Sequence, residues 1–219
     1  MSVAYDNAAI DSGYNVTELE TAIEIGSGTN RAALVCLHTY ANDPTGDEMS
    51  GSCGGVSLSA VSLYYGNLNG VLVFGCVNPA SGNQTASLSW TTTHASWKYL
   101  GVLTLAGAAQ TSTFDGVVTA TIAYNSTPVS VEITSDSGDL TVSFAGTSGT
   151  ANTTNQTERY GAGTARGCDT GPGTGTATHT WSASGSARKA CVGVNVNQAA
   201  AGGLSIPVAM HHYQHNLGR

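Results

Sequence analysis

The sequence predicts an all-β protein, a two-sheet antiparallel sandwich of the jelly-roll kind with an extension at each end. Two observations lead to this prediction. Roughly a dozen short apolar or alternating segments follow one another about every ten residues, with Gly, Asn and Pro between them. No segment shows the sustained 3.6-residue apolar stripe, with capping residues, that is typical of an amphipathic helix.

The stretch of residues 70–106 predicts three consecutive strands at the centre of the sheet. Residues 71–77 are wholly apolar and stop at a turn-forming cluster that begins with Asn78 and Pro79. The next segment alternates apolar and hydroxyl residues, so that one face carries Ala86, Leu88 and Trp90. Residues 98–106 are apolar again and form the third strand of the prediction.

Further strands are expected on either side of this stretch. Those before it cover residues 14–25, 31–39 and 56–65, with a loop over residues 40–55. Those after it cover residues 117–124, 129–134, 140–144, 176–183 and 188–196. Residues 145–175 are expected to be exposed loop with one short strand near residues 156–160. The sandwich would span residues 14–198, between an N-terminal arm (1–13) and a C-terminal extension (199–219).

Alternation within these strands also predicts which side chains fill the core. The expected core residues are Val35, Leu37, Val71, Val73, Leu88, Trp90, Val131, Ile133, Leu140, Val142, Phe144, Val192 and Val194.

The charge of the chain excludes one class of partner. Lys and Arg number only 7, the formal net charge is −7, and charged residues make up 10% of the chain. A nucleic-acid surface needs clustered basic residues, so no nucleic-acid partner is expected.

No apolar run approaches the ~20 residues of a membrane helix, and residues 1–10 lack the features of a signal peptide. We therefore expect that the protein is synthesised in a cytoplasm and that it does not associate with a membrane.

The order of the segments resembles a diffuse group of β-sandwich proteins, jelly-roll or concanavalin-like, among the virion proteins of tailed phages and related bacterial surface modules. The matching segments are, in order, RAALVCLHTY, GVSLSAVSLYYG, LVFGCVNPASGNQTASLSW, AGAAQTSTFDG, GDLTVSFAGT, QTERYGAG, GTATHTWSAS and ARKACVGVNV. The resemblance covers residues 22–196 and implies the sandwich fold and a virion setting, after synthesis in the host cytoplasm. The two end extensions have no counterpart in that pattern.

Catalysis is not expected. Concanavalin-like glycosidases place two carboxylates across the sugar bond, but Glu18, Glu20 and Glu24 have the wrong spacing and no flanking aromatic platform. Glu132 and Asp136 straddle a strand end instead of sharing a face. A G-x-S-x-G nucleophile motif is absent as well. We therefore predict no catalytic residue.

Two segments carry residues that could bind a metal ion. Residues 42–48 offer oxygen ligands of the kind Ca²⁺ prefers, without the spacing of a known loop, so an ordinary solvated turn is favoured. His211, His212 and His215 would bind a transition metal only on a helix, which nearby Gly and Pro disfavour. Neither a metal nor another cofactor is predicted.

Five cysteines suggest two candidate disulfides. Cys53 and Cys168 form one candidate pair, because both lie in Gly-flanked segments that are predicted to be loops. Cys36 and Cys191 form the other, and they would come together if the first and last core strands are neighbours. Cys76 reads as a small apolar strand residue. Sequence cannot decide the pairing, and in a reducing cytoplasm either bond would form only after lysis.

The function expected first is that of a non-enzymatic structural protein of a phage virion, such as a capsid decoration (cement) protein or another repeated surface or tail component. The alternative is a carbohydrate- or receptor-binding adhesin or fibre module. That alternative requires aromatic rings exposed together in one groove. Trp97, Tyr40 and Tyr160 are the candidate platforms, since Trp90 and Trp181 lie on strands where they can be core.

Oligomerisation is expected because three strands are apolar on both faces, whereas an antiparallel sandwich normally keeps one face of each sheet wet. Residues 31–39, 71–77 and 100–106 therefore need a cover, either Gly-rich loops of the same chain or a neighbouring subunit with its arms. We expect a dimer or trimer, or contact with another shell or tail protein. The expected interface residues are Leu204, Ile206, Val208, Met210 and Tyr213.

Overall fold

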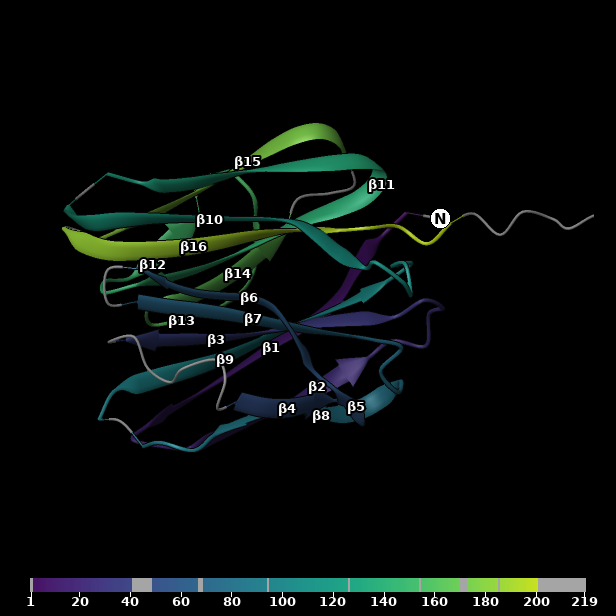
Figure 1. Ribbon diagram of the computed structural model, residues 1–219, viewed down its shortest axis with the longest axis horizontal. Helices are drawn as coiled ribbons and strands as arrows, with labels where there is room; N and C mark the ends of the chain where they lie inside the picture. Colours follow the sequence, from purple (N-terminus) through teal and green to yellow (C-terminus); the bar gives the residue numbers. More distant parts are fainter. Residues whose placement is uncertain are drawn as a thin grey trace, which may run out of the picture.

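The protein is an antiparallel β-sandwich with no helix in the part of the chain that the structure describes, as predicted. The structure is a computed structural model that describes residues 2–40, 49–66, 69–93, 95–125, 127–153, 155–169, 173–184 and 186–200. It contains three sheets where two were expected, stacked one above the other (Figure 1). We call them the lower, central and upper sheets, after their places in Figure 1.

The central sheet has the strand order β1-β9-β3-β7-β6. Its strands are β1 (Ala4–Tyr14), β9 (Trp97–Ala106), β3 (Ala32–Tyr40), β7 (Asn69–Val77) and β6 (Ser59–Gly66). The inner strands β9, β3 and β7 are buried along most of their length. They are apolar on both faces because both faces of this sheet pack against another sheet of the same chain.

The lower sheet has the order β2-β8-β4-β5. Its strands are β2 (Glu18–Ile25), β8 (Gly82–Trp90), β4 (Met49–Cys53) and β5 (Val56–Ser57). Burial alternates strictly along β2, with Leu19, Ile23 and Ile25 inside and the three glutamates outside. This sheet therefore has the single wet face that is typical of antiparallel sheets.

The upper sheet has the order β10-β16-β11-β14-β13. Its strands are β10 (Phe114–Asn125), β16 (Ala187–Val196), β11 (Val129–Thr147), β14 (Ala165–Asp169) and β13 (Thr157–Ala162). β11 bends where its register with β15 (Gly173–Ala183) shifts between Ser135 and Asp139, and Gly138 supplies a φ of 91° there. The first half of β11 pairs with β15, and β15 also pairs with β12 (Ala151–Thr153). We call these paired strands the ribbon, and it lies above β16 (Figure 1).

Two apolar layers hold the three sheets together. The layer between the central and upper sheets includes Leu34, Cys36, Val73, Leu103, Val142, Phe144, Val192 and Val194. The layer between the central and lower sheets includes Val35, Leu37, Leu72, Phe74, Leu88, Trp90 and Val102. A third cluster lies under the ribbon and contains Val131, Ile133, Trp181 and Cys191. Every predicted core residue is buried.

The covering of the two-faced strands corrects the sequence-based expectation. Neither Gly-rich loops nor a second subunit is needed to cover them. Ala32, Leu34, Leu103 and Leu105 pack toward the upper sheet, and Leu72 and Phe74 pack toward the lower sheet. The apolar second faces are accounted for within one chain, so they no longer argue for an oligomer.

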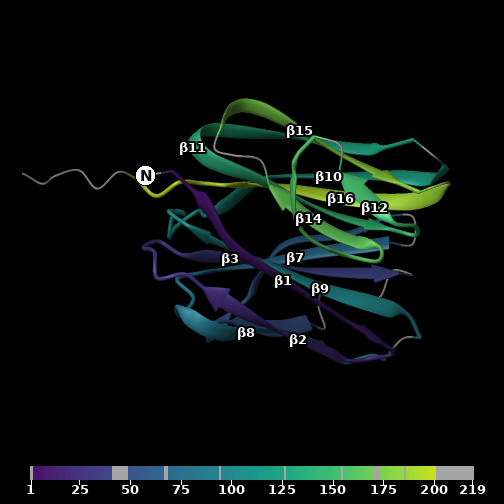
Figure 2. The same ribbon diagram turned by 180° about the vertical axis from the view of Figure 1, so that it is seen from behind.

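Three further expectations are corrected. The expected N-terminal arm (1–13) instead contains most of β1, which pairs with β9 from Ala4 opposite Ala106 to Tyr14 opposite Trp97 (Figure 2). β13 corresponds to the short strand expected near residues 156–160. The expected loop 40–55 contains β4, however, and residues 145–175 also contain β12 and β14. These strands are short or rich in Gly, Ala and Thr, so apolar alternation does not mark them. Residues 201–219, with the predicted interface residues, lie outside the described residues.

Candidate functional site

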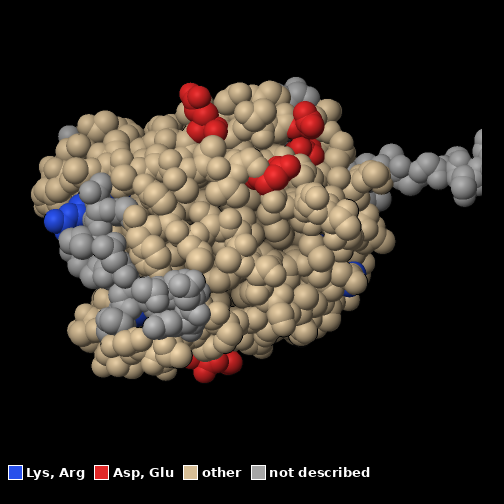
Figure 3. All heavy atoms as spheres, viewed as in Figure 1, with Lys and Arg blue, Asp and Glu red and all other residues tan. Residues whose placement is uncertain are grey.

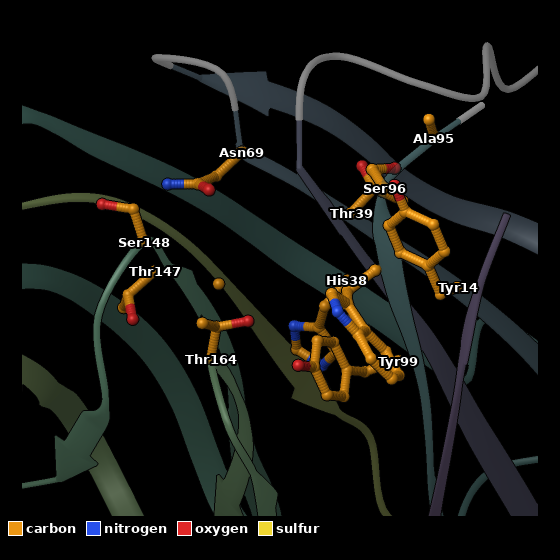
Figure 4. Close-up of a pocket in the computed structure, with 12 residues that line it drawn as sticks. Tyr14, His38, Thr39, Asn69, Ala95, Ser96, Tyr99, Thr147, Ser148 and Thr164 are labelled. Carbon is orange, nitrogen blue, oxygen red and sulfur yellow. The ribbon is translucent and has the colours of Figure 1, made fainter.

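A hollow of about 350 Å³ lies at the end of the sandwich where β3 ends and β7 begins (Figure 4). This volume is within the range of small-molecule sites. The hollow is bounded by the central sheet, by the loop before β9 and by the ends of upper-sheet strands. Its lining consists of Tyr14, His38, Thr39, Asn69, Ala95, Ser96, Trp97, Tyr99, Gly146, Thr147, Ser148 and Thr164.

Three aromatic rings form one rim of the hollow. Tyr14 is 53% exposed and Trp97 is 54% exposed, and their ring centroids lie 5.8 Å apart. The Trp97 and Tyr99 rings stack with centroids 6.4 Å apart and 26° between their planes. The pairing of β1 with β9 places Tyr14 opposite Trp97, and Tyr99 follows two residues later on the same face of β9. Edge strand β1 and its neighbour β9 thus present a continuous aromatic surface.

Hydroxyl-bearing residues form the opposite wall. Figure 4 shows Thr147, Ser148 and Thr164 across the hollow from Tyr14 and Tyr99. The Thr147 backbone N–H donates to the Thr164 carbonyl at 3.0 Å, which joins the end of β11 to the turn between β13 and β14. The described lining has no Lys, Arg, Asp or Glu side chain. The wall can therefore exchange hydrogen bonds with a ligand but offers it no charge.

His38 lies at the floor of the hollow and is neutral at neutral pH. Burial and, to a smaller extent, the positive charge of Arg166 lower its pKa to about 3, against a smaller opposite effect of a hydrogen bond with the Ala145 backbone. The His38 Nε2 atom lies 3.1 Å from the Tyr160 hydroxyl. The imidazole thus adds a polar but uncharged group to the lining.

Two glycines hold Tyr160 in place beside His38. A Cβ atom at either Gly101 or Gly167 would collide with the Tyr160 ring. Gly101 belongs to β9 and Gly167 to β14, so the ring lies between the central and upper sheets. Side chains at these two positions would exclude the tyrosine that contacts His38.

Three of the residues that line the hollow carry buried polar atoms without a hydrogen-bond partner. Among the described residues, the Thr39 hydroxyl, the Asn69 side-chain amide nitrogen and the His38 Nδ1 atom have no hydrogen-bond partner, although the three residues are 5%, 1% and 2% exposed. Leaving a buried polar group unpaired costs about 1–3 kcal/mol. Three such groups at one hollow are an arrangement that a bound polar ligand would stabilise.

The structure describes two of the three predicted aromatic side chains, and these two lie in different environments. Trp97 is exposed at the rim, as predicted. Tyr160 is buried in the core beneath the hollow, so it is not a platform. The side chain of Tyr40 is not among those that the structure describes. Sequence reasoning missed Tyr14 and Tyr99. The i, i+2 spacing of Trp97 and Tyr99 was a usable signal for a shared strand face.

None of the candidate catalytic carboxylates lines the hollow. Glu18, Glu20 and Glu24 face solvent on β2, opposite Ser89, Ser87 and Asn83 of β8. Glu132 and Asp136 are exposed on β11. In the described part of the chain, no three His, Cys, Asp or Glu side chains are grouped so as to hold a metal ion. Residues 42–48, His211, His212 and His215 lie outside that part.

The structure separates one of the two candidate cysteine pairs and brings the other pair near each other. Cys53 ends β4 in the lower sheet and Cys168 lies in β14 of the upper sheet, so neither is in a loop and the central sheet separates their strands. Cys36 and Cys191 are near enough for an electrostatic interaction, but both are free thiols. Cys53 and Cys76 are also free, and they contact each other. The Cys168 side chain lies outside the description.

Fold and hollow together define an antiparallel β-sandwich with an uncharged, aromatic-rimmed site at one end. No protein-family model matches the chain, and a search of curated proteins finds no match either. The described residues contain no helix long and apolar enough to cross a membrane.

Proposed function

We propose that this protein is a non-enzymatic glycan-binding module that holds a neutral sugar in the hollow at the end of β3. The observation that carries this proposal is the juxtaposition of exposed rings and unpaired polar groups. Tyr14, Trp97 and Tyr99 lie on one side, and the lining also includes Thr39 and Asn69, each of which carries an unpartnered polar atom.

The chemistry of a sugar matches both sides of this site. A pyranose has an apolar face of C–H groups, which packs against an aromatic ring, and a rim of hydroxyls, each able to donate and accept a hydrogen bond. The Thr39 hydroxyl and the Asn69 amide would gain partners from such hydroxyls. An acidic or phosphorylated sugar would find no cationic partner in the described lining.

The surface of the molecule fits recognition of a neutral ligand. Charged residues are only 10% of the chain, and the face seen in Figure 3 consists mainly of uncharged residues, with a few separated acidic and basic groups. The resemblance to phage virion and bacterial surface modules adds a setting to the proposal. There, the module would act on a virion or cell surface as the part that contacts a glycan receptor.

A glycan array followed by titration calorimetry with one soluble oligosaccharide tests this proposal. The full chain is expected to bind neutral glycans, and Trp97→Ala is expected to weaken binding by ~10-fold or more, the loss of roughly 1.4 kcal/mol of ring contact. Tyr124→Ala is the matched control, because Tyr124 is 67% exposed on β10 outside the hollow. Absence of any glycan binding, or equal affinity for Trp97→Ala, would contradict the proposal.

A structural subunit of a phage virion is the second candidate. The observation that favours it is the edge strand β10, which lies at the end of the upper sheet and exposes Val117 by 40% and Tyr124 by 67%. An exposed edge strand with apolar side chains is a surface on which another chain can pair. Light scattering on the full chain is expected to give a dimer or trimer that Tyr124→Asp dissociates. A monomer at high concentration would contradict this candidate.

A further inference from the structure

Two thiols meet between the lower and central sheets. Cys53 is the last residue of β4, and Cys76 is the penultimate residue of β7. The Cys76 Sγ lies 3.9 Å from the Cys53 carbonyl oxygen, within hydrogen-bonding distance for a thiol donor, and the two side chains also hydrogen-bond each other. Both belong to the apolar layer between the two sheets. Two side chains far apart in sequence are thus held together by sheet packing.

A second hollow is lined by one of these two cysteines. It has a volume of about 380 Å³ and is lined by Cys76 together with Val56, Ser59, Val61, Thr113 and Phe114, among others. Gly75 leaves room for the Phe114 ring, since a Cβ atom there would collide with it. Cys76 is 5% exposed, whereas Cys53 is fully buried behind it and does not line the hollow.

The thiols differ in acidity. The hydrogen bond with Cys53 lowers the pKa of Cys76, and a hydrogen bond with the backbone of Ala33 lowers it further, although burial acts in the opposite direction. The same thiol–thiol hydrogen bond, together with burial, raises the pKa of Cys53. The thiolate is the reactive form of cysteine. The more acidic thiol therefore belongs to the cysteine that lines the hollow.

We propose that Cys53 and Cys76 form a thiol–disulfide exchange site that takes a small-molecule disulfide in the hollow beside β6 and β7. The Cys76 thiolate attacks one sulfur of the small disulfide, whose S–S bond breaks, and the released small thiolate takes up the proton lost from Cys76. Cys53, as its proton leaves, then attacks the Cys76 sulfur of the mixed disulfide and expels the second small thiolate, which takes up that proton. Two protein thiols are oxidised to one disulfide, and the small disulfide is reduced to two thiols.

The other buried pair provides an internal comparison. Cys36 and Cys191 also lie near each other, but each is fully buried and neither lines the hollow that Cys76 lines or the one at the end of β3. Burial raises the pKa of Cys36 well above its usual value. This pair is therefore expected to stay reduced under conditions that oxidise Cys53 and Cys76.

Peptide mapping of the native full-length protein tests the proposal. The protein is incubated with 2-hydroxyethyl disulfide, quenched with acid, alkylated and digested. Trypsin is unsuitable because Arg31 and Lys98 are the nearest cleavage sites and leave both cysteines in one peptide, whereas chymotrypsin separates them by cutting after Tyr64 or Tyr65. The expected product is a Cys53–Cys76 cross-linked peptide pair, with Cys36 and Cys191 alkylated.

Two variants separate the two steps. Cys53→Ser is expected to stop at the mixed disulfide on Cys76, and Cys191→Ser is expected to form the cross-link as the native protein does. Thermal melts establish that both variants are folded. The proposal is overturned if Cys76 stays reduced in the native protein while it reacts in denaturant, or if its cross-link is to a cysteine other than Cys53. The native-protein map alone decides this if a variant fails to fold.

Discussion

The Nε2 atom of His38 lies 3.1 Å from the hydroxyl oxygen of Tyr160, a residue 122 positions further along the chain. This contact joins the end of β3 to β13 and fixes the floor of the aromatic-rimmed hollow. It depends on the space that Gly101 and Gly167 leave for the tyrosine ring. The geometry of the site is thus set by packing between sheets.

Gly101→Ala is expected to destabilise the fold by ~1–3 kcal/mol, because the new methyl group would displace the Tyr160 ring from a close-packed core. Sugar affinity should fall as well, since His38 loses its support. Denaturant unfolding and calorimetry measure the two effects. In a double-mutant cycle, Tyr160→Ala should remove part of the penalty of Gly101→Ala, and strictly additive losses would contradict the proposed collision.

Thr39→Val is expected to stabilise the free protein by up to ~1–3 kcal/mol while weakening sugar binding, because the buried hydroxyl has no partner until a ligand supplies one. Thr104→Val is the matched control. The Thr104 hydroxyl donates to Asp6 at 3.0 Å and accepts from the Asn7 N–H at 3.1 Å, so its loss should be destabilising. Equal effects of the two substitutions on unfolding in urea would argue against an unsatisfied Thr39.

Stability should decrease as the pH falls below about 6.5. Burial lowers the pKa of His38 to about 3 and that of His179 to about 4. In the unfolded chain these histidines have the ordinary pKa of ~6.5. Between the folded-state pKa and this value, the unfolded chain therefore binds more protons than the folded one. The free energy of unfolding then falls by ~1.4 kcal/mol for each pH unit and each such histidine as the pH decreases. Urea unfolding between pH 4.5 and 7 measures this slope. His179→Gln should reduce it, and an unchanged slope would show that His179 does not contribute.

Phe144→Ala is expected to cost ~3–5 kcal/mol, since Phe144 is fully buried between the central and upper sheets. Val117→Ala, at a 40% exposed position, should change stability by less than ~0.5 kcal/mol. Chemical denaturation of both variants compares them. A loss well below 1 kcal/mol for Phe144→Ala would mean that the central and upper sheets are not packed through this side chain.

Sequence patterns identified the strands that carry strong apolar signals. The runs that became β3, β7 and β9 were recognised as core, and their two apolar faces correctly showed that a cover was needed. Sequence could not say what covers them, because period-2 patterns report that a face is buried and not which element buries it. Edge strand β1, with Asp6, Asn7 and Asp11 among small residues, carries too little apolar alternation to be distinguished from a polar arm.

The site was less predictable than the fold. Trp97 was identified because it follows a polar loop, but Tyr14 joins it only through the register of β1 on β9. Thr39 and Asn69 are ordinary polar residues in sequence, and they become candidates only because burial leaves their polar atoms without partners. Contacts between Cys53 and Cys76 likewise depend on how two sheets stack.

The three sheets divide the chain by order of appearance. Every strand of the central and lower sheets lies within the first 106 residues, and every strand of the upper sheet begins at Phe114 or later. A nascent chain can therefore pair its first two sheets while the face carrying Leu34, Leu103 and Leu105 is still bare. That face stays open to other chains until β11 and β16 leave the ribosome. Slow translation between these two parts should favour aggregation over folding.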